Sequence, residues 1–415
     1  MTAPAPHPRN AAIAFILVTA VLDVMALGIV IPVLPQLIQE FTGSNARAGF
    51  INGAFVALWA VMQFIFSPLI GSLSDRFGRR PIILISSAGL ALDYVLIALA
   101  PNLWWLAAAR IIGGITAASF STASAYLADV TPPEGRAKAY GLIGAAWSAG
   151  FVAGPLLGGL LGDWSPRAPF WAAGALSAVA FVYGLFVLPE SLAPEKRMAF
   201  SWRRANPVGS LRLLRSHPEL TGLAGVNFLL WFAHHVFTAV FVLYAAYRYD
   251  WGPSEVGGVL ALVGVLDMIV QGLVTGRLVK RFGDANVMVL GLIGGAIGLA
   301  GMGAAPTGWW FIAAMFPNAL WGLAMPTLQS LMTRRVSESE QGQLQGANAS
   351  VQSIAGIASP LFFGWVYSMS IDGTHSTGAS GIAFFLSAVV LATAALIGWR
   401  IAGAASPKES APVPA

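Results

Sequence analysis

The chain has 415 residues, of which 57% are hydrophobic and only 10% are charged, whereas a soluble domain carries about 25% charged residues. This composition excludes a soluble domain and predicts an all-α protein that crosses a membrane many times. The absence of cysteine excludes disulfides, thiolate catalysis and cysteine-based metal sites.

Breaks at charged or Pro/Gly-rich points divide the sequence into twelve apolar segments, each close to the 20 or so residues that a membrane span needs. The first six run over residues 12–38, 48–73, 81–100, 103–127, 137–161 and 168–188. The second six run over 220–244, 255–279, 286–304, 309–332, 343–367 and 381–400. We therefore expect a cytoplasmic tail over 1–10, a six-helix bundle over 11–189, a cytoplasmic linker over 190–218, a second six-helix bundle over 219–402 and a tail over 403–415.

A repeat relates the two halves of the chain. The segment from Gly71 to Arg80 reads GSLSDRFGRR and is partly repeated from Gly276 to Gly283, 205 residues later. The same offset relates Pro101, Trp104, Trp105, Pro155 and Leu156 to Pro306, Trp309, Trp310, Pro360 and Leu361. Repeats of this kind are typical of transporters, in which the substrate site lies between the repeats near the middle of the bilayer. The repeat predicts two pseudo-symmetric six-helix bundles.

The positions of lysine and arginine predict the orientation, because cytoplasmic loops carry an excess of both. With both termini in the cytoplasm, only Arg47, Arg167 and Arg248 fall in loops on the opposite side. We expect a multi-pass protein of the cell membrane, the inner membrane in bacteria. The net charge of +5 then reflects this orientation and contact with anionic lipid headgroups, and we expect no nucleic-acid partner.

Four ionisable residues fall inside the predicted spans: Asp23, Asp93, Arg110 and Asp267. Each costs at least about 2.5 kcal/mol at the centre of a helix and therefore faces a partner or water. The three acids outnumber the one base, and a carboxylate that lacks its own cation can take up a proton, as a proton-driven carrier requires. In the alternative interpretation, Asp93 and Arg110 form a static ion pair between spans three and four.

Large and polar side chains deep in the spans are candidates to line a drug-sized cavity, although core packing is the ordinary role of an aromatic residue there. They are Phe55, Trp59, Gln63, Trp147, Asn227, Trp231, His234, Gln271 and Trp321. His234 is followed by His235, and a proton relay or ordinary packing remain open for this pair. Neighbouring helical residues point about 100° apart, so the two rings are not expected to share one ligand.

Small residues recur at about four-residue spacing along span five, at Gly150, Gly154, Gly158 and Gly159. They form a smooth face that another helix can approach closely. Pro155 lies within this run and predicts a kink that serves as a hinge or seal between bundles.

These motifs together resemble those of the major facilitator superfamily. Gly71 to Arg80 is similar to its signature loop between spans two and three, Arg110 to Gly114 to its span-four element, and Gly154 to Gly159 to the antiporter motif of span five. Closer resemblance to the twelve-span drug:proton antiporters of the tetracycline-resistance type lies in Leu22-Asp23, Pro32-Val33-Leu34-Pro35 and Leu92-Asp93-Tyr94.

The resemblance implies roles for individual residues. Asp75 would cap the start of span eleven and latch the two halves, and Arg76, Arg79 and Arg80 would pair with acids such as Asp129. Breaking such a charge cluster is a plausible switch between inward-open and outward-open states. By the same resemblance, Arg110 serves proton coupling, and Asp23 and Asp93 handle the proton or the substrate.

The second half departs from the tetracycline-type pattern. The resemblance places a histidine in span eight where this chain has Asp267, and an acid in span nine where it has Gly295. A carboxylate at the first position keeps a protonation site, and we expect it to favour a cationic or metal-chelated drug.

We predict a monomeric proton-coupled antiporter that exports tetracycline or another lipophilic drug by alternating access, without a cofactor and with the proton gradient as its energy source. A proton-coupled importer of a sugar or organic acid would use the same fold. A membrane-embedded enzyme would need a converging nucleophile and base or a metal cluster, and no such constellation is visible, so we do not expect an enzyme.

Overall fold

The computed structural model describes residues 9–117, 119–131, 136–198, 200, 212–337, 340–371 and 380–405. All regular elements within these residues are helices, and no strand occurs among them, which confirms the predicted all-α class. The predicted tails and the linker over 190–218 fall partly outside the described residues.

Ten helical runs within the described part of the chain are long and apolar enough to cross a membrane. One of them, Pro253–Ala304, is 52 residues long and contains the predicted spans eight and nine. Predicted span four corresponds to the shorter α5 (Leu103–Thr116) followed by α6 (Ser119–Val130). These runs are therefore consistent with twelve spans.

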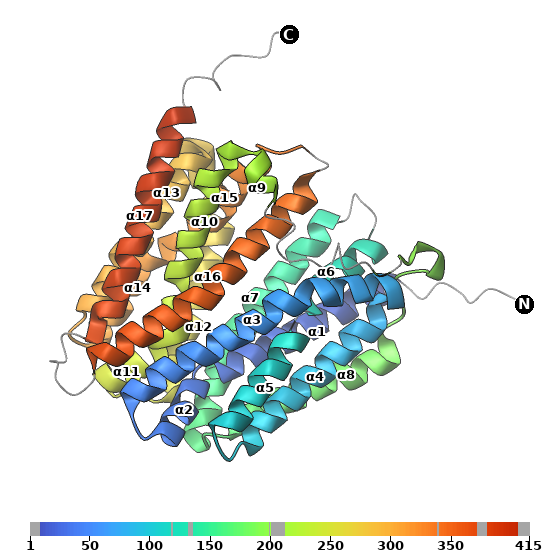
Figure 1. Cartoon of the computed structure of the whole chain (residues 1–415), viewed down its shortest axis with the longest axis horizontal. Helices are drawn as coiled ribbons and strands as arrows, with labels where there is room; N and C mark the ends of the chain where they lie inside the picture. The colour runs from blue at the N-terminus through green and yellow to red at the C-terminus, as the bar shows by residue number, and fades with distance from the viewer. Residues whose placement is uncertain are drawn as a thin grey trace, which may run out of the picture. The chain divides into compact units, whose positions relative to one another are not determined.

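The first compact unit comprises Met1–Gly43, Leu58–Pro207 and Trp251–Leu262. Its helices are α1 (Arg9–Val30), α2 (Leu34–Thr42), most of α3 (Asn45–Phe77), α4 (Arg79–Leu99), α5, α6, α7 (Arg136–Trp164) and α8 (Ala168–Val187). Within it, α1 packs on α7 and α8, and α4 packs on α5 and α8 (Figure 1).

The glycine face of α7 accounts for its close packing on α1. A Cβ atom on Gly154 would lie 2.7 Å from the Met25 carbonyl oxygen, and one on Gly158 would clash with the backbone of Ile29. Small residues let two helix backbones approach in this way. Gly154 and Gly158 of span five thus contact span one.

The second compact unit comprises Ser44–Ala57, Val208–Asp250 and Val263–Ala415. Its elements are α9 (Arg212–Ser216), α10 (Pro218–Val236), the π-helix η4 (Phe237–Phe241), α11 (Val242–Tyr249), the end of α12 (Pro253–Ile269), the π-helix η5 (Val270–Val274), α13 (Thr275–Ala304), α14 (Gly308–Ala319), the 3-10 helix η6 (Leu320–Leu323), α15 (Ala324–Thr333), α16 (Gln341–Ser370) and α17 (Ile382–Ala405). The closest helix pairs are α13 with α17 and α14, and α10 with α16 and α17 (Figure 1).

Two long helices divide their contacts between the units. Residues Ser44–Ala57 at the start of α3 belong to the second unit, whereas Trp251–Leu262 at the start of α12 belong to the first. The amide of Asn52 donates to the carbonyl oxygens of Thr238 and Ala239 at 3.1 and 2.9 Å. The backbone N–H of Ser254 donates to Asp163 at 3.3 Å. The units are therefore not contiguous halves of the chain, and the division at 190–218 stays a prediction.

The predicted repeat reappears in the backbone conformation. Gly78 separates α3 from α4 with φ of +103°, and Gly283 interrupts α13 with φ of +76°. The two glycines are 205 residues apart, and positive φ is a conformation that glycine adopts at little cost. The break at Gly283 separates predicted span eight from span nine.

Candidate functional site

A buried ion pair joins α4 to α5 in the first unit. Nη2 of Arg110 donates to both carboxylate oxygens of Asp93, at 2.6 Å to Oδ2 and 2.9 Å to Oδ1. Only 9% of the Arg110 side chain and 2% of the Asp93 side chain are exposed. This is the ion pair between spans three and four that was the alternative interpretation of the sequence. A role of the two residues in proton coupling stays a prediction.

Gly113 makes room for this ion pair. It lies on α5 near Arg110, and a Cβ atom at this position would clash with Oδ2 of Asp93. Any larger residue would therefore displace the carboxylate. Nε of Arg110 is buried and has no hydrogen-bond partner among the described residues, so this N–H is an unused donor.

Asp23 differs from Asp93 because it forms no ion pair with any residue that the structure describes. Within the described part of the chain, its Oδ1 atom is buried without a hydrogen-bond partner. It lies on α1, far from either end of that helix. A buried carboxylate in this state is costly in a membrane unless it binds a proton or a ligand. A role of Asp23 in proton coupling stays a prediction.

Where α3 ends and α4 begins, charged residues form a cluster around Arg79. Its Nη1 atom donates to Asp75 Oδ1 and to Ser74 Oγ, both at 2.6 Å. Its Nε atom donates to Asp129 of α6 at 3.3 Å. The pairing of Arg79 with Asp129 that the resemblance implied is thus present in the structure.

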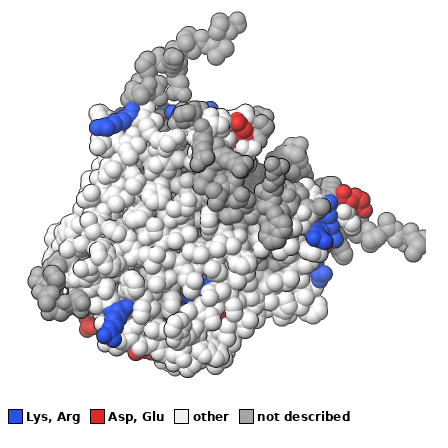
Figure 2. Space-filling view, viewed as in Figure 1, with Lys and Arg blue, Asp and Glu red and all other residues white. Residues whose placement is uncertain are grey.

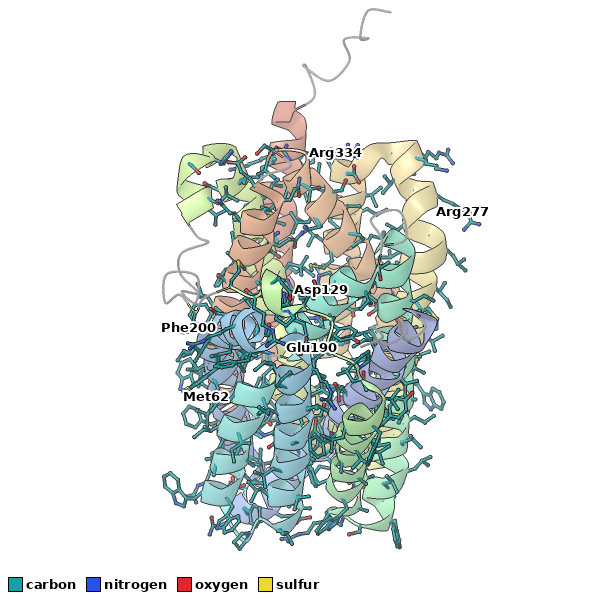
Figure 3. The ribbon with its side chains drawn as sticks, turned by 90° about the vertical axis from the view of Figure 1, so that its right-hand side faces the viewer. Met62, Asp129, Glu190, Phe200, Arg277 and Arg334 are labelled. Atoms are coloured by element: carbon teal, nitrogen blue, oxygen red, sulfur yellow. The ribbon has the colours of Figure 1, made fainter. Side chains whose placement is uncertain are left out.

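Glu190 completes this cluster at the N-terminus of α4. Its carboxylate accepts from the backbone N–H groups of Arg79 at 2.8 Å and Arg80 at 3.3 Å, where a negative charge is stabilised by the helix dipole. A side chain at Gly78 would clash with it. Figure 3 shows Glu190 near Asp129. Sequence reasoning missed Glu190, and its position directly after span six was the only available signal.

The other two arginines of the signature loop have different partners. Arg80 donates to the carbonyl oxygen of Leu185 at 2.8 Å. The Arg76 guanidinium lies over the ring of Phe77, 5.1 Å from its centroid. The predicted contact of Asp75 with the start of span eleven stays a prediction.

An aromatic and acidic region occurs in the second unit. The ring of His234 on α10 lies 5.3 Å from Trp231 and 5.7 Å from Trp321 of η6, measured between centroids. Asp267 of α12 lies beside Gly322, with its Oδ1 atom 3.3 Å from the point where a Cβ atom would be, and Gln271 approaches the same point. The structure therefore gathers these five predicted residues around η6.

A π-helix follows each ionisable group of this region. The helix η4 begins two residues after His235, and η5 begins three residues after Asp267. Their free carbonyl groups are partly satisfied by Asn52, as described above, and by the hydroxyl of Thr275, which donates to Val270 at 2.9 Å. Single π-turns inside α-helices frequently mark functional sites, and no sequence pattern indicated these two.

A chain of three amides crosses the second unit. Asn227 of α10 donates to Asn348 of α16 at 3.3 Å, and Asn348 donates to Gln329 of α15 at 3.1 Å. Nε2 of Gln329 is buried without a partner in the described structure. Asn227 was predicted from its depth in span seven, whereas Asn348 and Gln329 were missed because both lie close to predicted span ends.

The remaining predicted residues are divided between the units. Phe55 is buried in the part of α3 that belongs to the second unit, whereas Trp59, Gln63 and Trp147 belong to the first. Trp147 is 36% exposed. Among the described residues, no three histidine, aspartate or glutamate side chains gather as metal ligands.

Comparison with known proteins identifies the family to which the chain is similar. The model of the Major Facilitator Superfamily matches residues 16–360 and 223–415. The chain is 39% identical over 361 residues to the class C tetracycline resistance protein of Escherichia coli, which covers 87% of this chain and 91% of that protein. It is 37% identical over 361 residues to the class D tetracycline resistance protein of Salmonella ordonez, covering 86% and 91%.

A solved structure supports the fold alone. The crystal structure of the nucleoside transporter NupG superposes with a TM-score of 0.77 at 13% sequence identity and covers 94% of this chain and 98% of that one.

Proposed function

Because the chain belongs to the major facilitator superfamily, we propose that it is a proton-coupled antiporter that exports tetracycline or a related drug. Six relatives, between 33% and 39% identical over most of the chain, are tetracycline resistance proteins. The observation that supports the proton coupling is the surplus of acid in the first unit, where Asp93 is paired with Arg110 and Oδ1 of Asp23 is buried without a hydrogen-bond partner among the described residues.

The two acids suit different tasks. Asp93 is held by Arg110 through two hydrogen bonds, so its carboxylate has a cation as its partner. Asp23 has no such cation among the described residues, and we expect it to bind a proton on one side of the membrane and release it on the other. A ligand shifts an alternating-access equilibrium only as far as its affinities for the two states differ, and the proton gradient gives the cycle its direction.

The region around η6 supports a cationic or metal-chelated substrate. Asp267 supplies a negative charge, and Trp231 and Trp321 supply aromatic faces that attract a cation. His234 between the two indoles adds a ring nitrogen that can donate or accept a hydrogen bond. These groups come from three separate elements of the second unit: α10, α12 and η6.

Orientation and oligomeric state belong to the same proposal. Both termini lie in the cytoplasm, consistent with the excess of basic residues in the loops on that side. The protein works as a monomer surrounded by lipid, uses no cofactor and does not carry out enzymatic chemistry. No observation in the structure favours the metabolite importer.

Proton movement in inverted membrane vesicles tests the proposal. Adding magnesium-chelated tetracycline to energised vesicles is expected to release protons from the wild-type protein and not from the Asp23→Asn variant. Asp250→Asn is the matched control, because Asp250 is exposed and has φ of +57°, which asparagine also tolerates. Equal proton release by Asp23→Asn and wild type would exclude Asp23, and no release with tetracycline or any lipophilic cation would exclude drug antiport.

A further inference from the structure

A groove with a volume of about 730 Å³ runs between α13 and α17 on the surface of the second unit. Its walls are apolar and include Ile293, Ile297, Val389 and Trp399. Some of these side chains lie on the outer surface of the protein: Val389 and Trp399 are each 62% exposed. The groove plays no part in the drug or proton sites described above.

Small residues create the groove. The helices α13 and α17 lie side by side (Figure 1), with a Cβ atom on Gly398 only 2.8 Å from Met288. Ala296 on α13 and Ala392 on α17 line the floor. Side chains as short as these leave a furrow between the larger residues on either wall.

We propose that this groove binds one acyl chain of an anionic glycerophospholipid. Both helices are long and apolar enough to cross a membrane, so the open side of the groove faces hydrocarbon. Its lining on α13 runs from Val289 to Ala300, which corresponds to about 17 Å along a helix. That length is about half the 30 Å hydrocarbon core and lies within the apolar part of the span.

The charge at one end of the groove selects the headgroup. Arg400 is exposed and directly follows Trp399, the last groove residue on α17. An arginine at the membrane surface attracts an anionic headgroup, and tryptophan is enriched at the headgroup level. Figure 2 shows an uncharged surface along α17 and basic surface at its upper end. A lipid phosphate on Arg400 would therefore place its chain in the groove.

The same charge argues against a second copy of the protein as the occupant. Two copies in one membrane share their orientation, and a twofold contact through this groove would bring the two Arg400 side chains together. Like charges in such a contact oppose association. Because lipid tails are as apolar as the groove walls, close packing and the headgroup charge determine which molecule stays bound.

Native mass spectrometry of the purified protein with phosphatidylglycerol and phosphatidylethanolamine of identical chains tests the acyl-chain site. Wild type is expected to retain one phosphatidylglycerol, and Ala392→Phe, which fills the floor, to retain roughly tenfold less, a difference of about 1.4 kcal/mol. Ala313→Phe is the control, because Ala313 is also an exposed alanine but lies on α14 outside the groove. Equal retention by these two variants would overturn the site.

A second pair of variants tests the headgroup. Arg400→Ala is expected to lower the preference for phosphatidylglycerol over phosphatidylethanolamine about fivefold. Arg277→Ala should leave it unchanged, because Arg277 lies at the start of α13 outside the groove lining, where its guanidinium donates to the carbonyl oxygen of Leu273. An unchanged lipid preference in Arg400→Ala would overturn the headgroup assignment. So would a result in which an uncharged detergent displaces phosphatidylglycerol from wild type as readily as from Arg400→Ala. If wild type forms dimers and Ala392→Phe does not, a second copy of the protein and not a lipid occupies the groove.

Discussion

Arg334 and Asp284 form an ion pair at 2.7 Å that repeats, with its charges reversed, the contact between Asp129 and Arg79. Each residue lies 205 positions after its counterpart, and each pair follows a glycine with positive φ. The stacking of Arg76 on Phe77 also recurs, as Arg281 lies 5.3 Å from the Phe282 ring centroid. The repeat therefore preserves the geometry of this turn but not the sign of its charges.

Exchanging the two charges of the second pair tests whether geometry alone matters. Asp284→Arg and Arg334→Asp should each destabilise the protein, because Asp284 is buried and also accepts from Ser330 at 3.2 Å. The double variant recreates the arrangement of the first half and should recover the part of the loss that is due to the ion pair. Since the Arg334 side chain is 64% exposed, we expect a coupling energy of no more than about 1 kcal/mol.

Thermal unfolding of the four proteins in detergent, treated as a double-mutant cycle, measures this coupling. Additive effects of the two substitutions would mean that the ion pair contributes nothing. The Arg334→Lys variant serves as a control, because it keeps the charge and loses only the planar geometry of the guanidinium.

The fold could be predicted from the sequence to a large extent. Family membership, the all-α class and the repeat are confirmed, because apolar spans and the Gly71–Arg80 signature are local patterns that the bilayer imposes directly. The division of α3 and α12 between the units could not be predicted, since it depends on packing between distant segments. The two π-helices could not be predicted from the sequence either, because they depend on partners such as Asn52 that lie far away in the sequence.

Removing the Arg110 side chain should have a large effect on both stability and transport. Arg110→Ala leaves the buried Asp93 carboxylate without its cation, and breaking a buried pair on one side costs about 3–5 kcal/mol. The double variant Asp93→Asn with Arg110→Gln removes both charges and should fold better than Arg110→Ala.

Unfolding temperature and drug efflux should then separate two roles of this pair. A double variant that folds and exports drug at the wild-type rate would make the pair a static link between α4 and α5. We expect that variant to fold and to lose proton-coupled efflux.

The space that Gly113 leaves for Asp93 gives a steric prediction. Gly113→Ala should push the carboxylate away from Arg110, because the added methyl group would clash with Oδ2 of Asp93, and crowding of this kind costs about 1–3 kcal/mol. Gly144→Ala in the same unit is the control, since a Cβ atom there meets nothing within 4 Å. Efflux rates and unfolding temperatures that are equal for the two variants would contradict the crowding.

At the start of α16, outside the membrane spans, Glu340 provides a prediction about pH. Hydrogen bonds from the side chain and backbone of Ser337 lower the pKa of Glu340 below its ordinary value of 4.5. A lowered pKa stabilises the folded state above the unfolded-state pKa, and this contribution is lost as the pH falls through the folded-state value. Hydrogen exchange of the Ser337 amide, corrected for intrinsic rates, should therefore show constant protection from pH 8 to about pH 5. Loss of protection within that range would contradict the prediction, and Glu340→Ala should lower the protection at every pH.

The candidate site was less predictable than the fold, and the reason differs from residue to residue. Asp23, Asp93 and Arg110 stood out because charges inside a span are rare and costly. Glu190 was missed because an acid in a loop has no periodic pattern, and its role appears only when the N-terminus of α4 is placed beside it. Gln329 and Asn348 were missed because amides near span ends are common and only their mutual contact distinguishes them.

The amide chain yields the last prediction. Asn348→Leu should destabilise the protein by about 1–3 kcal/mol, because it leaves Asn227 Nδ2 and Gln329 Oε1 buried without partners. Replacing all three amides by leucine removes the unsatisfied groups together and should restore much of that stability. A measurement of drug efflux then distinguishes a structural role of the three amides from a role in binding the drug. Gln329 already has a buried donor without a partner, so we expect an oxygen of the drug to be its acceptor and the triple variant to fold without exporting drug. A triple variant that both folds and exports at the wild-type rate would show that the chain only connects α10, α15 and α16.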